Sequence, residues 1–400
     1  MSEKEKQAAP VQDSQMNLGQ ADRIGKYLVP HLKEMLFDEL SEGYLKKAGM
    51  ADILMDVPVP IRKSDLGGGI STLTIARGMA FVIGCDPGFK YKENYVEYII
   101  RSFGKKFAEG LIADGVEGAE KNDYDYACIQ FRSAMLVDPK NADAYYCYGR
   151  ACKDAYETAS GSEGDFQILT ENGKTSASMS ETEEFIGRFK AESLEAFEVA
   201  TLKNPQLSPA FYFLGYAYAN MGLYVKAKLT WDDYLKLTAA DLETMTGESL
   251  EELKKLRKEI EDRVLSMKDP VAIEKGYNLI LSSRFEEGIQ ALDAYRDSEY
   301  AGWWPLWYYL GTAHEGLGED EEAIECLLKV LSLAPSNTEC MEKLEKLYQK
   351  QGNEEKAEKY RRKIQIVKDN LMKDRKLAEE NEAAQKVSQV MMKDATGKIN

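Results

Sequence analysis

The chain has 400 residues, a formal net charge of −16 at pH 7 and an apolar content of 44%. This length allows two or three ordinary domains, or one long array of repeats. The acidic balance argues against nucleic acid and anionic membranes as partners, because both are bound through basic surfaces.

The first seventeen residues (1–17) are polar and charged, which predicts a disordered tail without the apolar run of a signal peptide. The longest apolar stretch, residues 70–85, is interrupted by Arg77 and is too short to span a bilayer. The 6 cysteines form no CxxC pair, so we expect reduced thiols rather than a disulfide framework. These features predict a cytoplasmic protein.

Residues 18–107 predict a helical N-terminal region that we assign to no family. Apolar residues at helical spacing predict one helix over residues 20–49, which Pro30 kinks or divides.

An extended segment is predicted over residues 53–61, where prolines alternate with apolar residues. A second helix is predicted over residues 71–84 with Ser71 as its N-cap, and a third from Tyr95 to Leu111. Three glycines at 67–69 precede the second helix and predict a flexible turn, because they lack the ending of a phosphate-binding loop.

After residue 107, glycines recur at a period close to 34. Gly149 follows Gly115 by 34 residues, and Gly311 follows Gly276 by 35. The intervals on either side of Gly215 are 66 and 61, which equal 34 plus insertions of 32 and 27. Helical hairpins with this period stack on one another, because no single hairpin can bury its apolar face alone.

The residues around these glycines resemble the tetratricopeptide repeat family. Its pattern places an aromatic residue and Leu-Gly in the first helix, then Ala, an aromatic residue and Ala in the second, then Pro. The resemblance covers about residues 108–371 and implies an all-α solenoid of six antiparallel helix pairs in a right-handed superhelix. The clearest unit matches the pattern at Phe211, Leu214, Gly215, Tyr218, Gly222, Tyr224, Ala227 and Trp231.

Two insertions, residues 157–184 and 241–268, interrupt the repeats. Asn172 and Gly173 in the first predict a β-hairpin, either as a flexible loop or as an arm that contacts a partner. The second has apolar residues at helical spacing and predicts a spacer helix packed on the solenoid. Residues 372–400 predict a charged helix and tail, either a solvated extension or a helix-docking segment.

The resemblance implies that the first helix of each pair lines a concave groove. Tyr145, Leu214 and Tyr218 are expected to be buried, whereas residues next to them face the groove. The Lys/Asn/Arg set with which some family members hold a chaperone's C-terminus is not reproduced. Arg150 is the strongest cation available to an acidic partner group. The predicted groove residues are Tyr146, Arg150, Tyr212, Tyr216, Asn220 and Tyr308.

The sequence has only two histidines, His31 and His314, and predicts no catalytic, metal or cofactor site. His314 is expected to pack within a first helix. The sequence therefore predicts a non-enzymatic adaptor that binds a protein or peptide, and it leaves the oligomeric state open. The alternatives are a self-assembling structural protein that uses its N-terminal region and C-terminal helix, and an enzyme with a site in residues 50–107.

Overall fold

The structure, a computed structural model, describes residues 22–63, 71–161, 167–170, 173–370 and 372–373. The chain divides into two compact units, unit 1 up to Val264 and unit 2 from Leu265 onward. The predicted tail at residues 1–17 lies outside the described residues, as does the C-terminal extension after residue 373. None of the helices in the described ranges combines the length and apolarity that a membrane crossing needs.

Unit 1 begins with short elements, so the helix predicted over residues 20–49 is wrong. Its place is taken by α1 (Gly25–Leu28), the 3-10 helix η1 (Val29–Glu34), strand β1 (Met35–Asp38) and helix α2 (Glu42–Ala48). Pro30 lies in the first turn of η1, where a missing backbone N–H breaks no helical hydrogen bond. The N-terminal region is therefore only partly helical.

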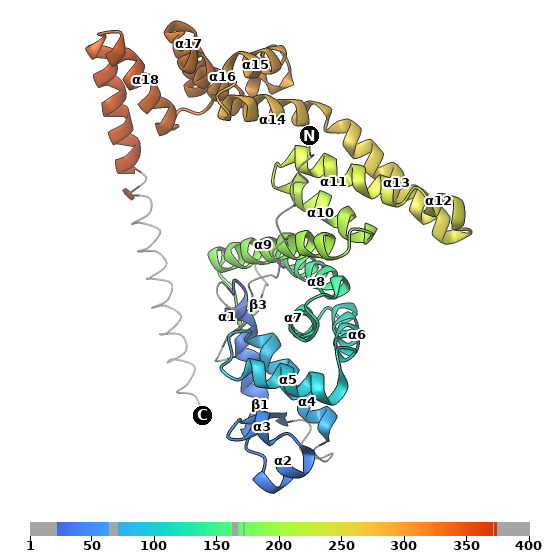
Figure 1. The fold of residues 1–400 in the computed structure, drawn as a ribbon. Coiled ribbons are helices and arrows are strands. Elements are labelled where there is room, and N and C mark those ends of the chain that lie inside the picture. The colour runs from blue at the N-terminus through green and yellow to red at the C-terminus, as the bar shows by residue number, and fades with distance from the viewer. Residues whose placement is uncertain (1–21, 64–70, 162–166, 171–172, 371, 374–400) are drawn as a thin grey trace, which may run out of the picture. The chain divides into compact units, whose positions relative to one another are not determined.

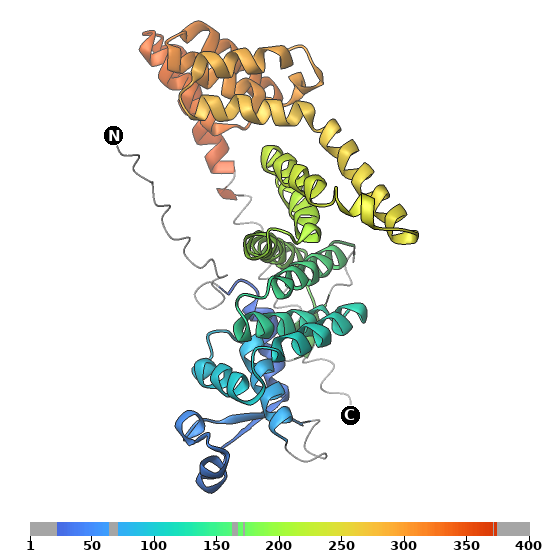
Figure 2. The ribbon, with the colours of Figure 1, turned by 45° about the vertical axis from the view of Figure 1, so that its right-hand side comes forward.

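Strand β1 pairs antiparallel with β2 (Val59–Arg62), with Met35 opposite Arg62, and Figure 2 shows the two strands near the blue end of the chain. Val59 and Ile61 of β2 are buried. The extended prediction for residues 53–61 holds for β2 but is wrong at its start, which lies in helix α3 (Ala51–Leu54).

Helix α4 (Thr72–Cys85) begins as predicted at Ser71, whose Oγ accepts a hydrogen bond of 3.1 Å from the backbone N–H of Thr74. The third predicted helix is instead two helices, α5 (Lys92–Phe103) and α6 (Phe107–Glu120). Gly104 separates them with a φ of 69°, a conformation that favours glycine and ends the helix.

From α6 onward the helices form sequential antiparallel pairs, which confirms the predicted all-α fold (Figure 1). The handedness of the predicted superhelix stays a prediction. In unit 1 the pairs are α6 with α7 (Tyr124–Val137), α8 (Ala142–Gly161) with α9 (Met179–Lys203), and α10 (Ser208–Asn220) with α11 (Tyr224–Leu237). In unit 2 they are α14 (Lys268–Leu281) with α15 (Phe285–Leu292), and α16 (Trp304–Leu317) with α17 (Asp320–Leu333). Helix α18 (Thr338–Lys350) shares a core with the helix at residues 354–370, where the rings of Tyr348 and Tyr360 stack.

The repeated glycines lie where the two helices of a pair approach most closely, as predicted. A Cβ atom added to any of them would come within 3.1 Å of a side chain on the second helix of its pair. These side chains fill the space that the missing Cβ leaves, which is why a larger residue would overpack the crossing. The contacts join Gly115 to Phe131, Gly149 to Phe197, Gly215 to Trp231, Gly276 to Leu292 and Gly311 to Leu327.

The two insertions are partly helical. The ends of α8 and α9 extend into the first insertion and are joined through the predicted hairpin, β3 (Gln167–Thr170) with β4 (Gly173–Ser176). Its turn residues 171–172 lie outside the described ranges. The second insertion contains α12 (Asp241–Thr244) and the predicted helix, α13 (Glu248–Ser266), which buries Ile260 completely. The boundaries assigned to the repeats and insertions stay predictions.

Candidate functional site

The first helices alternate between buried and partly exposed side chains as their geometry predicts. Tyr145, Leu214 and Tyr218 are 2%, 5% and 8% exposed, respectively. Neighbouring residues point about 100° away from them, and so retain access to solvent. The partly exposed residues on α8 and α10 include Tyr146, Arg150, Tyr212 and Tyr216.

An aromatic surface joins α8 to α9 and α10. The Tyr146 ring lies 6.1 Å from the Phe213 ring and 6.3 Å from the Phe197 ring, and Phe197 and Phe213 stack 5.7 Å apart. The Arg150 guanidinium lies 4.4 Å from the centroid of Phe213 and donates a hydrogen bond of 3.3 Å to the Tyr146 hydroxyl. We call the partly exposed part of this cluster, Tyr146, Arg150 and Phe213, the α8 surface.

The charge on the α8 surface is incompletely neutralised. Arg150 Nη2 lies 4.0 Å from the carboxylate of Asp154, which is too far for a hydrogen bond. The Arg150 side chain remains 41% exposed. Burial raises the pKa of Asp154 above its ordinary value. Arg150 can therefore accept a carboxylate from another molecule.

The tyrosines of α10 are partly exposed, but α13 already engages their hydroxyls. The Tyr212 hydroxyl donates to Glu259 Oε2 at 3.5 Å, and the Tyr216 hydroxyl donates to Glu259 Oε1. The Arg263 guanidinium lies 4.7 Å from the centroid of the Tyr216 ring. Burial, together with the bond to Glu259, raises the pKa of Tyr216, and the same bond lowers the pKa of Glu259. The part of the predicted groove in unit 1 that α13 does not engage is therefore the α8 surface.

The remaining two predicted residues lie elsewhere. Asn220, at the end of α10, lines a cavity of about 600 Å³ together with Tyr156, Lys190 and Met221. Tyr308 lies on α16 in unit 2. The structure thus links Tyr146 and Arg150 to Tyr212 and Tyr216 through Phe213, whose ring lies 6.1 Å from Tyr146 and 5.1 Å from Tyr212.

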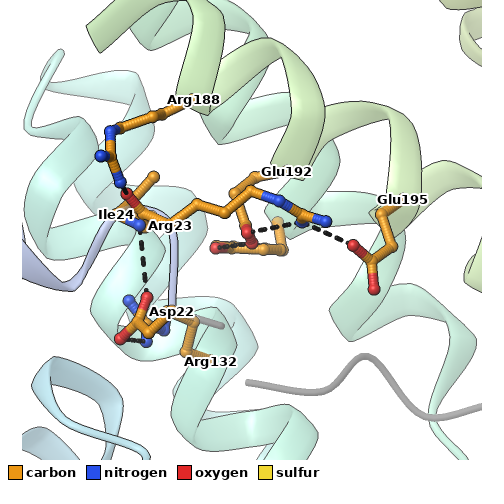
Figure 3. A network of polar contacts seen from close by, with 8 residues as sticks. Asp22, Arg23, Ile24, Arg132, Arg188, Glu192 and Glu195 are labelled. Carbon is orange, nitrogen blue, oxygen red and sulfur yellow. Dashed lines mark hydrogen bonds and ion pairs between the residues drawn. The ribbon is translucent and has the colours of Figure 1, made fainter. Parts of the chain in front are cut away.

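A polar network that the sequence did not reveal fixes the start of the described chain on α7, α8 and α9 (Figure 3). Arg132 Nη2, on a completely buried side chain of α7, donates to Asp22 Oδ2 at 2.5 Å. Arg23 Nη1 donates to Glu192 at 3.0 Å and to Glu195 at 2.6 Å, both on α9. These ion pairs hold residues 22–23 against the second helices of two pairs.

The same segment is held by further contacts. Tyr148 of α8 donates a hydrogen bond of 2.8 Å to the buried carboxylate of Glu192, and Arg188 donates one of 2.7 Å to the carbonyl of Arg23. The Tyr27 ring packs edge-on against Phe185 at 4.9 Å. A signal for this network was present in the sequence, since Arg132 interrupts the apolar face of α7. Its partners are too distant in the chain to be inferred.

Both histidines have polar partners. His31 Nε2 lies 3.3 Å from Asp125 Oδ2. His314 is 8% exposed, with Nδ1 2.6 Å from Glu319 and Nε2 3.2 Å from Arg296. Because arginine only donates, Nε2 accepts and Nδ1–H donates, so the neutral ring satisfies both contacts. Within the described ranges, no group of three or more His, Cys, Asp and Glu residues could hold a metal ion.

Comparison with known proteins finds one repeat directly: residues 304–337, which include α16 and α17, match the tetratricopeptide repeat family. No curated protein matches the chain. Among solved structures, MamA 41-end from Desulfovibrio magneticus RS-1 is 18% identical, with 46% of this chain and 87% of that chain covered and a TM-score of 0.28. The P58(IPK) TPR domain is 13% identical, with 84% of this chain and 85% of that chain covered and a TM-score of 0.35. A chain of the APC/C hetero-tetramer Cut9–Hcn1 is 13% identical, with 77% of this chain and 64% of that chain covered and a TM-score of 0.28.

Proposed function

We propose that this protein is a non-enzymatic, cytoplasmic adaptor that binds a partner peptide or protein on the first helices of its repeats. The observation that carries the proposal is the α8 surface, where Arg150 lies on the Phe213 ring without a carboxylate in hydrogen-bond distance. Stacked helix pairs supply a rigid support for such a surface, and proteins built from tetratricopeptide repeats commonly mediate protein–protein interactions.

The chemistry of the α8 surface favours an acidic group beside an apolar one. Tyr146 and Phe213 provide partly exposed rings, and aromatic side chains contribute much contact area for little loss of conformational freedom. Arg150 can bind a carboxylate through two parallel hydrogen bonds, which are stronger than bonds between neutral groups. The proposed ligand is therefore a peptide that carries Asp, Glu or a free C-terminus next to an apolar side chain.

The test is binding of the full chain to an immobilised peptide array in which each acidic peptide has an Asn, Gln or C-terminal amide counterpart. We expect acidic peptides to be preferred, and Arg150→Ala to lose about tenfold or more in affinity for them. Arg77→Ala is the matched control, because Arg77 is an exposed arginine of α4 in the same unit, 3.4 Å from Asp114.

Far-ultraviolet circular dichroism of both variants checks that the helices remain intact. Equal binding of acidic peptides and their neutral counterparts would contradict the proposal. So would equal losses in the Arg150 and Arg77 variants.

A further inference from the structure

Two adjacent tryptophans at the start of α16 in unit 2 remain open to solvent. Trp303 is 40% exposed and Trp304 is 37% exposed. Tryptophan normally buries most of its large surface, so an exposed pair on a well-packed helix indicates a contact surface. Neither residue lies on the α8 surface, which belongs to unit 1.

Nearly perpendicular aromatic rings follow one another along this helix. We call the rings of Trp304, Tyr308 and Tyr309 the corner. The rings of Trp304 and Tyr308, one helical turn apart, have centroids separated by 6.1 Å and planes inclined by 81°. Tyr309 meets Tyr308 at 6.0 Å and 77°. Aromatic faces carry negative potential, and nearly perpendicular rings offer two such faces to one positive group.

A carboxylate completes this corner. The Tyr308 hydroxyl donates to Glu339 Oε1 of α18, and Glu339 is exposed. The Tyr308 ring already accepts a cation, because Lys343 Nζ lies 5.8 Å from its centroid while Glu315 neutralises that lysine at 2.5 Å. The ring and its surroundings are therefore suited to positive charge.

The repeat that contains the corner is acidic. Residues 304–337 hold six carboxylates and one lysine, which gives a net charge of −5 from these groups. A phosphate or a carboxylate brought to this repeat would be repelled, whereas a cation would be attracted. The acidic residues are Glu315, Glu319, Asp320, Glu321, Glu322 and Glu325, and the lysine is Lys329.

From this geometry we infer that Trp304, Tyr308 and Glu339 bind the cationic side chain, lysine or arginine, of a partner protein. The ammonium or guanidinium group would lie against the two ring faces and pair with the Glu339 carboxylate. This is a second binding surface on unit 2. It requires nothing of the α8 surface, and its charge preference is the opposite.

The experiment uses the full chain labelled with fluorotryptophan, whose 4 tryptophan signals are assigned by Trp→Phe substitutions. The probes are Nα-acetyl-lysine amide and Nα-acetyl-arginine amide, whose side chains keep their positive charge. Nα-acetyl-norleucine amide is the uncharged counterpart of the lysine probe. The Trp304 signal is expected to move saturably with both cationic probes and much less with norleucine. The signal of Trp231, in unit 1, should stay in place.

Two variants that each replace one carboxylate with a neutral amide test the role of Glu339. Glu339→Gln is expected to weaken lysine binding about three- to tenfold. Glu342→Gln removes the same charge from the same helix, where Glu342 pairs with Lys368 at 3.2 Å, and should leave binding within about twofold of the wild type. A fixed Trp304 signal, equal movement with norleucine, or equal losses in the two variants would overturn the inference. So would a larger shift with adenosine monophosphate, because it would show that the rings stack on a base.

Discussion

Replacing Gly215 with alanine tests the repeat register at its tightest point. The added Cβ would lie 2.1 Å from Trp231 Nε1 and 2.3 Å from Trp231 Cδ1, well inside van der Waals contact. The ring cannot move away freely, because it is 1% exposed and Nε1 donates a hydrogen bond of 3.0 Å to the carbonyl of Tyr212. The substitution therefore forces either α10 or Trp231 to shift.

The magnitude follows from opposing effects. Overpacking a core costs about 1–3 kcal/mol, and loss of the indole hydrogen bond adds about 1 kcal/mol. In the opposite direction, alanine stabilises the helix by about 1 kcal/mol relative to glycine, because glycine is the poorer helix former. Gly215→Ala is thus expected to lower the free energy of unfolding by about 1–3 kcal/mol.

Two other glycines provide matched controls within helices. Gly311 has Leu327 Cγ as its nearest neighbour at 3.1 Å, so the packing and helix-propensity effects should nearly cancel in Gly311→Ala. Gly110, inside α6, has nothing within 4 Å of an added Cβ. Gly110→Ala should therefore stabilise the protein by about 0.5–1 kcal/mol.

Urea denaturation followed by far-ultraviolet circular dichroism measures these differences, and hydrogen exchange of α10 and α11 assigns the Gly215 effect to unit 1. The expected order of stability is Gly110→Ala, then Gly311→Ala, then Gly215→Ala. A Gly215→Ala protein as stable as the Gly110→Ala protein would refute the reasoning, because it would show that the crossing has room for a methyl group.

Other contacts give further expectations. Asp22→Asn should lower the free energy of unfolding by about 3 kcal/mol in urea denaturation, because it leaves the completely buried Arg132 without its ion-pair partner. The pKa of Glu259 is lowered from 4.5, chiefly by the hydrogen bond from Tyr216, so its stabilising contribution is present above pH 4.5 and is lost as the pH falls through the lowered pKa. We therefore expect the unfolding midpoint of Glu259→Gln to fall less steeply than that of the wild type as the pH is lowered below 4.5. Tyr216→Phe should reduce this steepness in part, because the hydrogen bond is lost while the ring remains.

The repeat fold was predictable because the residues that each helix crossing requires lie close together in the sequence. A close helix crossing needs a small residue on one helix and a large one on the other, and both recur in register along the chain. Strand pairing has no such signature. Met35 of β1 faces Arg62 of β2, and this pairing overrides the helical spacing around Met35. The error in residues 20–49 follows from that non-local pairing.

The site was predictable only in part, for a related reason. Helical geometry separates buried from accessible positions on α8 and α10, and the burial of Tyr145 and Tyr218 agrees. Geometry within one helix says nothing about what lies over the accessible positions. Glu259 reaches Tyr216 from 43 residues away in the chain, so an accessible position of α10 became an internal contact. The buried charge of Arg132 escaped notice because its partner is 110 residues away.

The register explains how similar helix pairs can present different surfaces. Tyr146, Tyr212 and Tyr308 each lie three residues before the glycine of their repeat, and all three side chains are partly exposed. The Tyr146 hydroxyl accepts a hydrogen bond from a cation, Arg150, whereas the Tyr212 and Tyr308 hydroxyls donate to carboxylates. A tyrosine hydroxyl can do either, so the neighbouring side chain decides the charge of the surface. The part of the pattern that repeats along the chain therefore specifies how the helices pack. We expect binding preference to depend on the single residues beside each tyrosine, because these can change without disturbing the crossing at the glycine.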